Sequence, residues 1–136
     1  MKINSHNEWD KLREIIVGSA TGTTAVIEWH RPDPIDRNVY QEALDLCKKA
    51  TPKKVLDETN EDLDNLAEKL KNWGAKVMRP NVHDLSKFFS SPFWSSNGNN
   101  LYNVRDLNLV IGNHVIESPS HSISRFYEST ALYDIW

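Results

Sequence analysis

The 136-residue sequence predicts a single α/β domain, and three segments in the first 80 residues carry the prediction. Residues 12–18 hold a short β-branched run, residues 52–73 show the apolar spacing of an amphipathic helix, and residues 75–80 are again rich in strand-forming side chains. A strand, a helix and a second strand that are joined by short turns are typical of α/β folds.

The first strand is expected at residues 12–18. Ile15, Ile16 and Val17 form a run that is too short for a helix and is β-branched, which is typical of a buried strand. Gly18 then breaks the pattern, and the prolines within residues 31–34 oppose regular structure. We therefore expect a loop after this strand that reaches about residue 34.

A short amphipathic helix is expected at residues 38–49, where apolar side chains recur at helical spacing. Cys47 lies on its apolar stripe and is the only cysteine, so no internal disulfide or cysteine-rich zinc site can form. Because no histidine lies near it in the sequence, Cys47 is interpreted as a small buried thiol rather than a nucleophile.

The clearest element is the helix expected at residues 52–73. Thr51 is suited to cap it, Pro52 to the first helical position and Gly74 to the position after its end. One face is apolar and the other carries acidic and basic side chains. We interpret the charged face as solvated helix surface rather than as a metal-binding cluster.

The second strand is expected at residues 75–80, followed by a long loop at 81–100 whose aromatic side chains should pack against another surface. Residues 107–118 contain two β-rich runs around Gly112-Asn113, a dipeptide suited to a two-residue hairpin turn. Helical spacing resumes from residue 124 to residue 136.

Composition excludes several classes of protein. The net charge of −3, from 16 basic and 19 acidic side chains without like-charged blocks, argues against nucleic-acid binding. No apolar run reaches about eighteen residues, so no membrane-spanning helix is expected. The first eight residues lack a signal-peptide core, which favours the cytoplasm. The histidines have no companions at metal-ligand spacing, and we expect neither a metal nor a cofactor.

Three blocks of sequence resemble one enzyme family. They are residues 4–18, residues 73–80, and the region from Arg105-Asp106 through the hairpin to residues 116–119 and 124–128. Their order and spacing resemble the opening of glycine amidinotransferases and their bacterial relatives, which belong to the pentein superfamily. The resemblance implies ββαβ modules in a ring around a central site. Residues 1 to about 100 would then be the first module with its long loop, and about 101–136 the start of the second, an incomplete α/β propeller.

The resemblance also implies a reaction and a substrate. Family members take the amidino group from L-arginine, hold it on a cysteine and pass it to an amine. Asp106 corresponds to a family aspartate that contacts the arginine guanidinium, and Arg105 and Arg125 would support it. From the residues alone, Asp106 is interpreted as a turn or cap aspartate that needs no ligand, because aspartate often serves turns. Arg125 could instead pair with Glu128, and Arg105 could be an internal salt-bridge partner. Asn103-Val104 departs from the Met-Pro usual in the family.

The chain lacks counterparts of the family's catalytic acid, histidine and cysteine. Cys47 matches no family nucleophile, and no histidine is followed two residues later by aspartate, as the catalytic one is. We therefore expect the chain to be inactive alone. Its apolar last residues, 132–136, suggest a missing C-terminal portion or burial in a homo-oligomer. The alternatives are a non-catalytic, self-associating module derived from a pentein, and a fragment of an arginine deiminase-like guanidino hydrolase. The sequence does not identify the acceptor amine.

Overall fold

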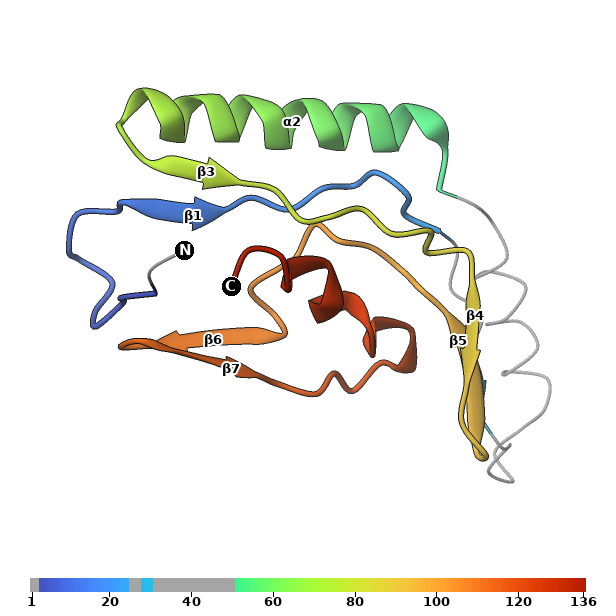
Figure 1. Ribbon diagram of the computed structural model, residues 1–136. Coiled ribbons are helices and arrows are strands. Elements are labelled where there is room, and N and C mark those ends of the chain that lie inside the picture. Colours follow the sequence, from blue (N-terminus) through green and yellow to red (C-terminus); the bar gives the residue numbers. More distant parts are fainter. Residues whose placement is uncertain (1–2, 25–27, 31–50) are drawn as a thin grey trace.

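The computed structural model describes residues 3–24, 28–30 and 51–136 (Figure 1). The helix expected at residues 38–49, with Cys47, lies outside the described residues, as does the proline-containing segment 31–34.

A parallel strand pair and one long helix form the first part of the fold. Strand β1 (Glu14–Ile16) pairs with β3 (Lys76–Met78), and helix α2 (Lys53–Asn72) lies along them (Figure 1). The core between them contains small and branched apolar side chains: Val17, Ala67, Leu70 and Ala75, with Ile15, Leu63 and Val77 packed against it. The strand–helix–strand order expected from the sequence is confirmed.

The ends of α2 follow the sequence only in part. Pro52 is the residue before the helix rather than its first residue, and no side chain caps the start, so the predicted Thr51 cap is wrong. At the other end Gly74 has a φ of +89°. Its N–H donates to Lys71 O and the N–H of Ala75 donates to Leu70 O, a Schellman motif that turns the chain directly into β3.

A second, antiparallel sheet lies where the sequence predicted loops. Strand β2 (Glu28–His30) pairs with β5 (Trp94–Asn97), which also pairs with β4 (Phe88–Ser90). The predicted long loop at residues 81–100 is therefore wrong, and so is the uninterrupted loop after β1. The expected packing of the aromatic side chains is confirmed for Phe89 and Trp94, since Phe89 makes edge-on contacts with Trp94 and with Tyr127. It is wrong for Phe88 and Phe93, which are exposed.

The last part is a hairpin followed by short helical turns. Strands β6 (Asn108–Ile111) and β7 (His114–Glu117) are joined by Gly112-Asn113, as predicted, and Gly112 has the positive φ that this turn requires. The regular helix expected after residue 124 is wrong. Two 3₁₀ segments, η1 (Ile123–Arg125) and η2 (Glu128–Leu132), occupy the region, because Tyr127 with ψ near 9° interrupts the helical course.

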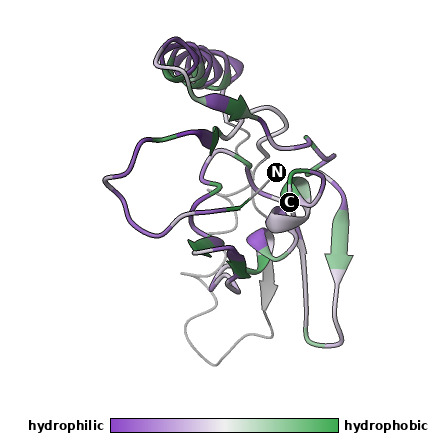
Figure 2. Ribbon diagram, turned by 60° about the vertical axis from the view of Figure 1, so that its left-hand side comes forward, coloured by the Kyte–Doolittle hydropathy of each residue, from purple (hydrophilic) through white to green (hydrophobic). Residues whose placement is uncertain are grey.

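Hydropathy divides these parts. Helix α2 is hydrophilic along much of its length (Figure 2), in keeping with its solvated outer face. No helix in the described ranges is long and apolar enough to cross a membrane.

Candidate functional site

Asp106 lies at the entrance to strand β6, as the sequence suggested. Its backbone N–H donates to Asn103 O at 3.1 Å, and the next residue, Leu107, is buried. Its side chain is 48% exposed. The turn and the buried neighbour therefore present the carboxylate to solvent at the edge of the hairpin. Asp106 is thus part of a turn, and its carboxylate is also free to contact other groups.

Arg125 anchors this carboxylate from the end of η1. Its Nη1 donates to Asp106 Oδ2 at 2.8 Å. Its Nε and Nη2 donate to Glu128 Oε2 and Oε1 at 2.5 and 2.7 Å, and Nη2 also reaches Asn103 O at 3.3 Å. The predicted pairing of Arg125 with Glu128 is confirmed, and the second contact, to Asp106, was not predicted. We call Asn103, Asp106, Arg125 and Glu128 the arginine clamp.

Burial makes the arginine clamp rigid on one side. The side chains of Arg125 and Glu128 are 14% and 6% exposed, so their two-pronged ion pair is held away from water. The pKa of Arg125 is raised above its ordinary value, chiefly because Glu128 accepts hydrogen bonds from it. Arg125 therefore stays charged, and its guanidinium group, which Glu128 holds in place, sets the position of Asp106 Oδ2. Asp106 Oδ1 has no hydrogen-bond partner among the described residues.

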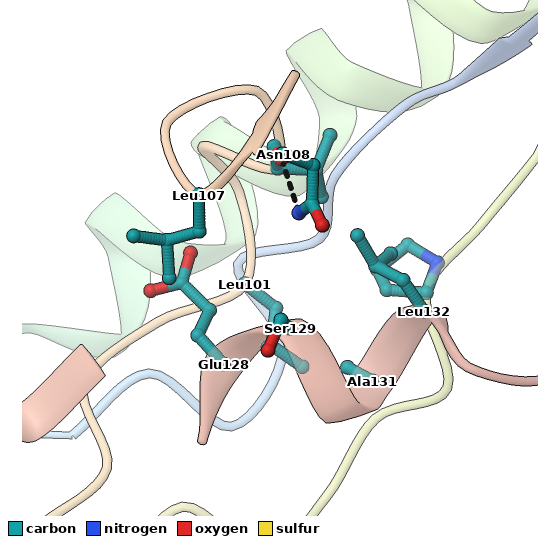
Figure 3. A pocket seen from close by; sticks show the side chains of 9 residues that line it. Leu101, Leu107, Asn108, Glu128, Ser129, Ala131 and Leu132 are labelled. Atoms are coloured by element: carbon teal, nitrogen blue, oxygen red, sulfur yellow. Dashed lines mark hydrogen bonds between the residues drawn. The ribbon is translucent and has the colours of Figure 1, made fainter. Parts of the chain in front are cut away.

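The wall behind the clamp is a closely packed contact between η2 and the base of the hairpin. Glu128, Ser129, Ala131 and Leu132 from η2 meet Leu101, Leu107 and Asn108 (Figure 3). Asn108 Nδ2 donates to Val104 O at 3.1 Å, the dashed bond in Figure 3. On the hairpin, Glu117 accepts hydrogen bonds from the hydroxyl groups of Ser129 and Tyr133. These contacts fix η2, and hence Glu128, relative to Asp106.

Arg105 does not join the clamp. It is exposed, and within the described ranges its side chain forms no ion pair, so the expected internal salt bridge is not found there. No group of three or more metal-ligating side chains occurs among the residues that the structure describes.

Comparisons with known proteins identify the fold and family. No protein-family profile matches the chain. It is 37% identical over 141 residues to inosamine-phosphate amidinotransferase 1 of Streptomyces griseus, covering 98% of this chain and 39% of that protein. It is 36% identical to the L-arginine:L-lysine amidinotransferase of Pseudomonas savastanoi, covering 93% of this chain and 35% of that protein.

Solved structures of amidinotransferases also match the fold of this chain. An inosamine-phosphate amidinotransferase from Streptomyces griseus superposes with a TM-score of 0.81 at 36% identity, over 98% of this chain and 38% of that one. An amidinotransferase of saxitoxin biosynthesis from Microseira wollei superposes with a TM-score of 0.79 at 31% identity, over 99% of this chain and 39% of that one. The chain is an N-terminal portion of an amidinotransferase. It spans less than two fifths of the length of the relatives that it matches.

The amidinotransferase portion also has a cavity beside the clamp that the sequence did not reveal. Its volume is about 150 Å³, and Glu128 lines it together with His83, Asp84, Lys87 and Tyr127, among others. The pKa of Asp84 is lowered, chiefly by a hydrogen bond from the Ser86 hydroxyl. Asp106 is not part of the lining. Only the i, i+3 spacing of Arg125 and Glu128 gave a sequence signal for this side of the site.

Proposed function

We propose that this chain supplies part of the guanidinium-binding site of an enzyme that transfers the amidino group of L-arginine to an amine. Asp106 is the proposed acceptor of the substrate guanidinium. The observation that carries the proposal is the state of its carboxylate: Arg125 holds one oxygen at 2.8 Å, and the other has no hydrogen-bond partner in the part of the chain that the structure describes, on a half-exposed side chain.

The chemistry suits a carboxylate held in this way. A guanidinium is planar and positive, and it is recognised by carboxylate oxygens that accept in-plane hydrogen bonds. Asp106 Oδ1 can accept one such bond directly, and Oδ2 keeps a second lone pair beside its bond to Arg125. Arg125 in turn prevents Asp106 from rotating away, because the buried Glu128 holds the arginine.

The covalent steps belong, in this proposal, to residues that the chain does not contain. Transfer needs a thiolate to attack the central guanidinium carbon and a histidine to move protons between the leaving and entering amines. The five histidines lack the expected spacing to aspartate, and the sole cysteine matches no family nucleophile. We also propose that residues 1 to about 100 form the first ββαβ module and that residues about 101–136 form the start of the second.

The named relatives favour amidino transfer over the hydrolysis carried out by arginine deiminases. One relative is named for both L-arginine and L-lysine, and others are named for inosamine phosphate or glycine. We therefore propose a guanidino substrate and leave the acceptor amine unassigned.

The test is an NMR titration of the ¹⁵N-labelled chain with L-arginine. Amide shifts should appear around Asn103, Asp106 and Arg125, with a dissociation constant of about 1 mM or weaker, since a single exposed carboxylate contributes little affinity. Citrulline, whose side chain is similar in shape but uncharged, should produce no such shifts, and Asp106→Asn should abolish those seen with arginine.

Two outcomes would count against the proposal. Equal shifts with citrulline, or unchanged shifts in Asp106→Asn, would remove Asp106 as the guanidinium acceptor. Formation of ornithine from arginine and an added amine by the 136-residue chain alone would show that it is catalytically complete.

A further inference from the structure

The cavity of about 150 Å³ beside the arginine clamp lies between three segments of the chain. Its described lining comes from within residues 83–89, 98–100 and 124–128. The first two segments are joined by a hydrogen bond from the backbone N–H of Gly98 to Leu85 O at 2.8 Å. Phe89 and Tyr127 connect the first segment to the third, with their ring centroids 4.9 Å apart. The cavity therefore forms without a ligand.

Asn100 presents an unused hydrogen-bond donor to this cavity. The residue is 5% exposed and lines the cavity, and its Oδ1 accepts a hydrogen bond from the backbone N–H of Tyr102 at 3.3 Å. That bond identifies the oxygen of the side-chain amide, so the other end is the Nδ2 donor. Nδ2 has no hydrogen-bond partner in the part of the chain that the structure describes. Because buried polar groups are ordinarily hydrogen-bonded, the free donor indicates a ligand.

Asp84 and Lys87 place opposite charges on the cavity wall. The backbone N–H and the hydroxyl group of Ser86 both donate to Asp84 Oδ1, at 3.2 and 2.6 Å. The pKa of Asp84 is lowered, chiefly by these hydrogen bonds, so its carboxylate is charged at neutral pH. Within the described ranges Asp84 Oδ2 and Lys87 Nζ have no partner. The wall thus offers a carboxylate oxygen and an ammonium group that are both able to bind.

Glu128 does not change this balance of charge. Both of its carboxylate oxygens accept hydrogen bonds from Arg125, and its side chain is 6% exposed. The charge of Glu128 is therefore compensated by Arg125. The rings of Phe89 and Tyr127 add apolar surface to the wall. The cavity combines a cation, an anion, an amide donor and apolar rings.

We propose that this cavity binds a small zwitterion, of the size of a two- or three-carbon α-amino acid. The carboxylate of the ligand accepts hydrogen bonds from Lys87 and from Asn100 Nδ2, and its ammonium group donates to Asp84 Oδ2. Its carbon atoms lie against the aromatic rings. A volume of about 150 Å³ equals the share of about five water molecules in the liquid, which suits about five to eight non-hydrogen atoms.

This ligand is additional to the guanidino substrate. Asp106 is not part of the cavity lining, and the groups that recognise the zwitterion lie on the other segments of the wall. The inference therefore does not rest on guanidinium binding by Asp106, and each can fail without the other.

The test is an NMR titration of the ¹⁵N-labelled 136-residue chain with glycine and with L-alanine at neutral pH. Amide shifts should appear at Leu85, at Lys87 and in residues 98–100, with a dissociation constant of about 1–10 mM. Acetate and methylammonium each carry one of the two charges of glycine. Each should bind at least about tenfold more weakly, because one half of the site then has no partner.

Substitutions at exposed positions test the two charges without disturbing the fold. Lys87→Gln and Asp84→Asn should each weaken glycine binding at least about fivefold. The matched controls are Lys71→Gln and Asp62→Asn, which remove the same charges from exposed positions on α2 and should leave binding unchanged.

Two further variants test the donor and the independence of the site. Asn100→Asp keeps an oxygen for the N–H of Tyr102 but replaces the free donor by a charged acceptor, so it should abolish glycine binding. Asp106→Asn should leave glycine binding unchanged. The amide spectrum of each variant in the absence of ligand checks that its fold is retained.

Four results would overturn the proposal. One is glycine binding that Lys87→Gln and Asp84→Asn leave unchanged. A second is equal affinity for acetate or for methylammonium, which would reduce the cavity to a site for a single charge. A third is the absence of shifts at about 100 mM glycine while the chain is folded. The fourth is loss of glycine binding in Asp106→Asn, since that result would make the cavity and the arginine clamp one site.

Discussion

The β1–β3 pair and the β6–β7 hairpin are both two-stranded, but only the first is covered by a helix. Helix α2 buries Ala67 and Leu70 against the parallel pair. The hairpin is instead held on its inner side by polar contacts, from Glu117 to η2, while Leu109, Ile111 and Ile116 remain exposed. The parallel pair therefore has an apolar core within this chain, whereas the hairpin has exposed apolar residues without one.

Gly18, which follows β1, lies against the backbone of Tyr102, and changing it should have the largest effect. A Cβ at this position would lie 2.2 Å from the backbone oxygen of Tyr102. Gly18→Ala should therefore lower the free energy of unfolding by at least about 4 kcal/mol, or prevent folding, as measured by urea denaturation. The control is Gly74→Ala, which meets no atom within 4 Å but has a φ of +89°, and should cost about 1–2 kcal/mol. Equal losses would mean that the contact at Gly18 relaxes.

The stability of the region formed by α2 and the β1–β3 pair should depend on buried apolar volume. Leu70 is 7% exposed and Leu66, on the same helix, is 46% exposed. Leu70→Ala should reduce the free energy of unfolding by about 3 kcal/mol, because it leaves a cavity between α2 and the strands. Leu66→Ala should cost less than about 1 kcal/mol. Similar values in thermal or urea unfolding would contradict the assignment of the core.

The stability of the hairpin region should depend on its ion pairs. Arg125→Met leaves the Glu128 carboxylate, 6% exposed, without its partner and should cost about 2 kcal/mol. Asp106→Asn should cost less, since Asp106 is 48% exposed. The double variant Arg125→Met with Glu128→Leu should recover part of the loss in urea denaturation. Additive losses would show that the two side chains do not act as a pair.

The exposed apolar face of the hairpin, formed by Leu109, Ile111 and Ile116, should contribute least to the stability of the chain alone. Leu109→Thr and Ile116→Thr remove apolar surface that is already in water, so each should change the free energy of unfolding by no more than about 0.5 kcal/mol. A loss as large as that of Leu70→Ala would mean that this face is buried within the chain, and the contrast between the two regions would fail.

The elements that the sequence predicted are those that local patterns specify. The run at Ile15–Ile16, the spacing through Leu63 and Leu70, and the Gly112-Asn113 turn each act within a few residues. Strand β5 was missed because Trp94–Asn97 contains two serines and an asparagine, and it exists by pairing with β2 and β4. The sequence after residue 124 has helical spacing, but tertiary contacts of η2 select 3₁₀ turns.

The site was predictable to a similar degree. The resemblance led to Asp106, and the i, i+3 spacing led to the Arg125–Glu128 pair. The contact between Arg125 and Asp106 joins residues 19 positions apart across the turn of a hairpin, and no local pattern encodes it. The cavity beside Glu128 escaped for the same reason, since its lining combines residues 83–89 with residues 98–100 and 124–128.

The register of the parallel pair has a consequence for the order of folding. Glu14 pairs with Lys76, so about 60 residues must be closed into a loop before β1 gains a partner, which is entropically costly and slow. The β6–β7 hairpin closes across two residues and should form within about 1–10 μs. The uncovered hairpin is therefore expected early, with its apolar face in water, while the covered pair assembles last. In a pulsed hydrogen-exchange experiment the amides of β6 and β7 should gain protection before those of β1.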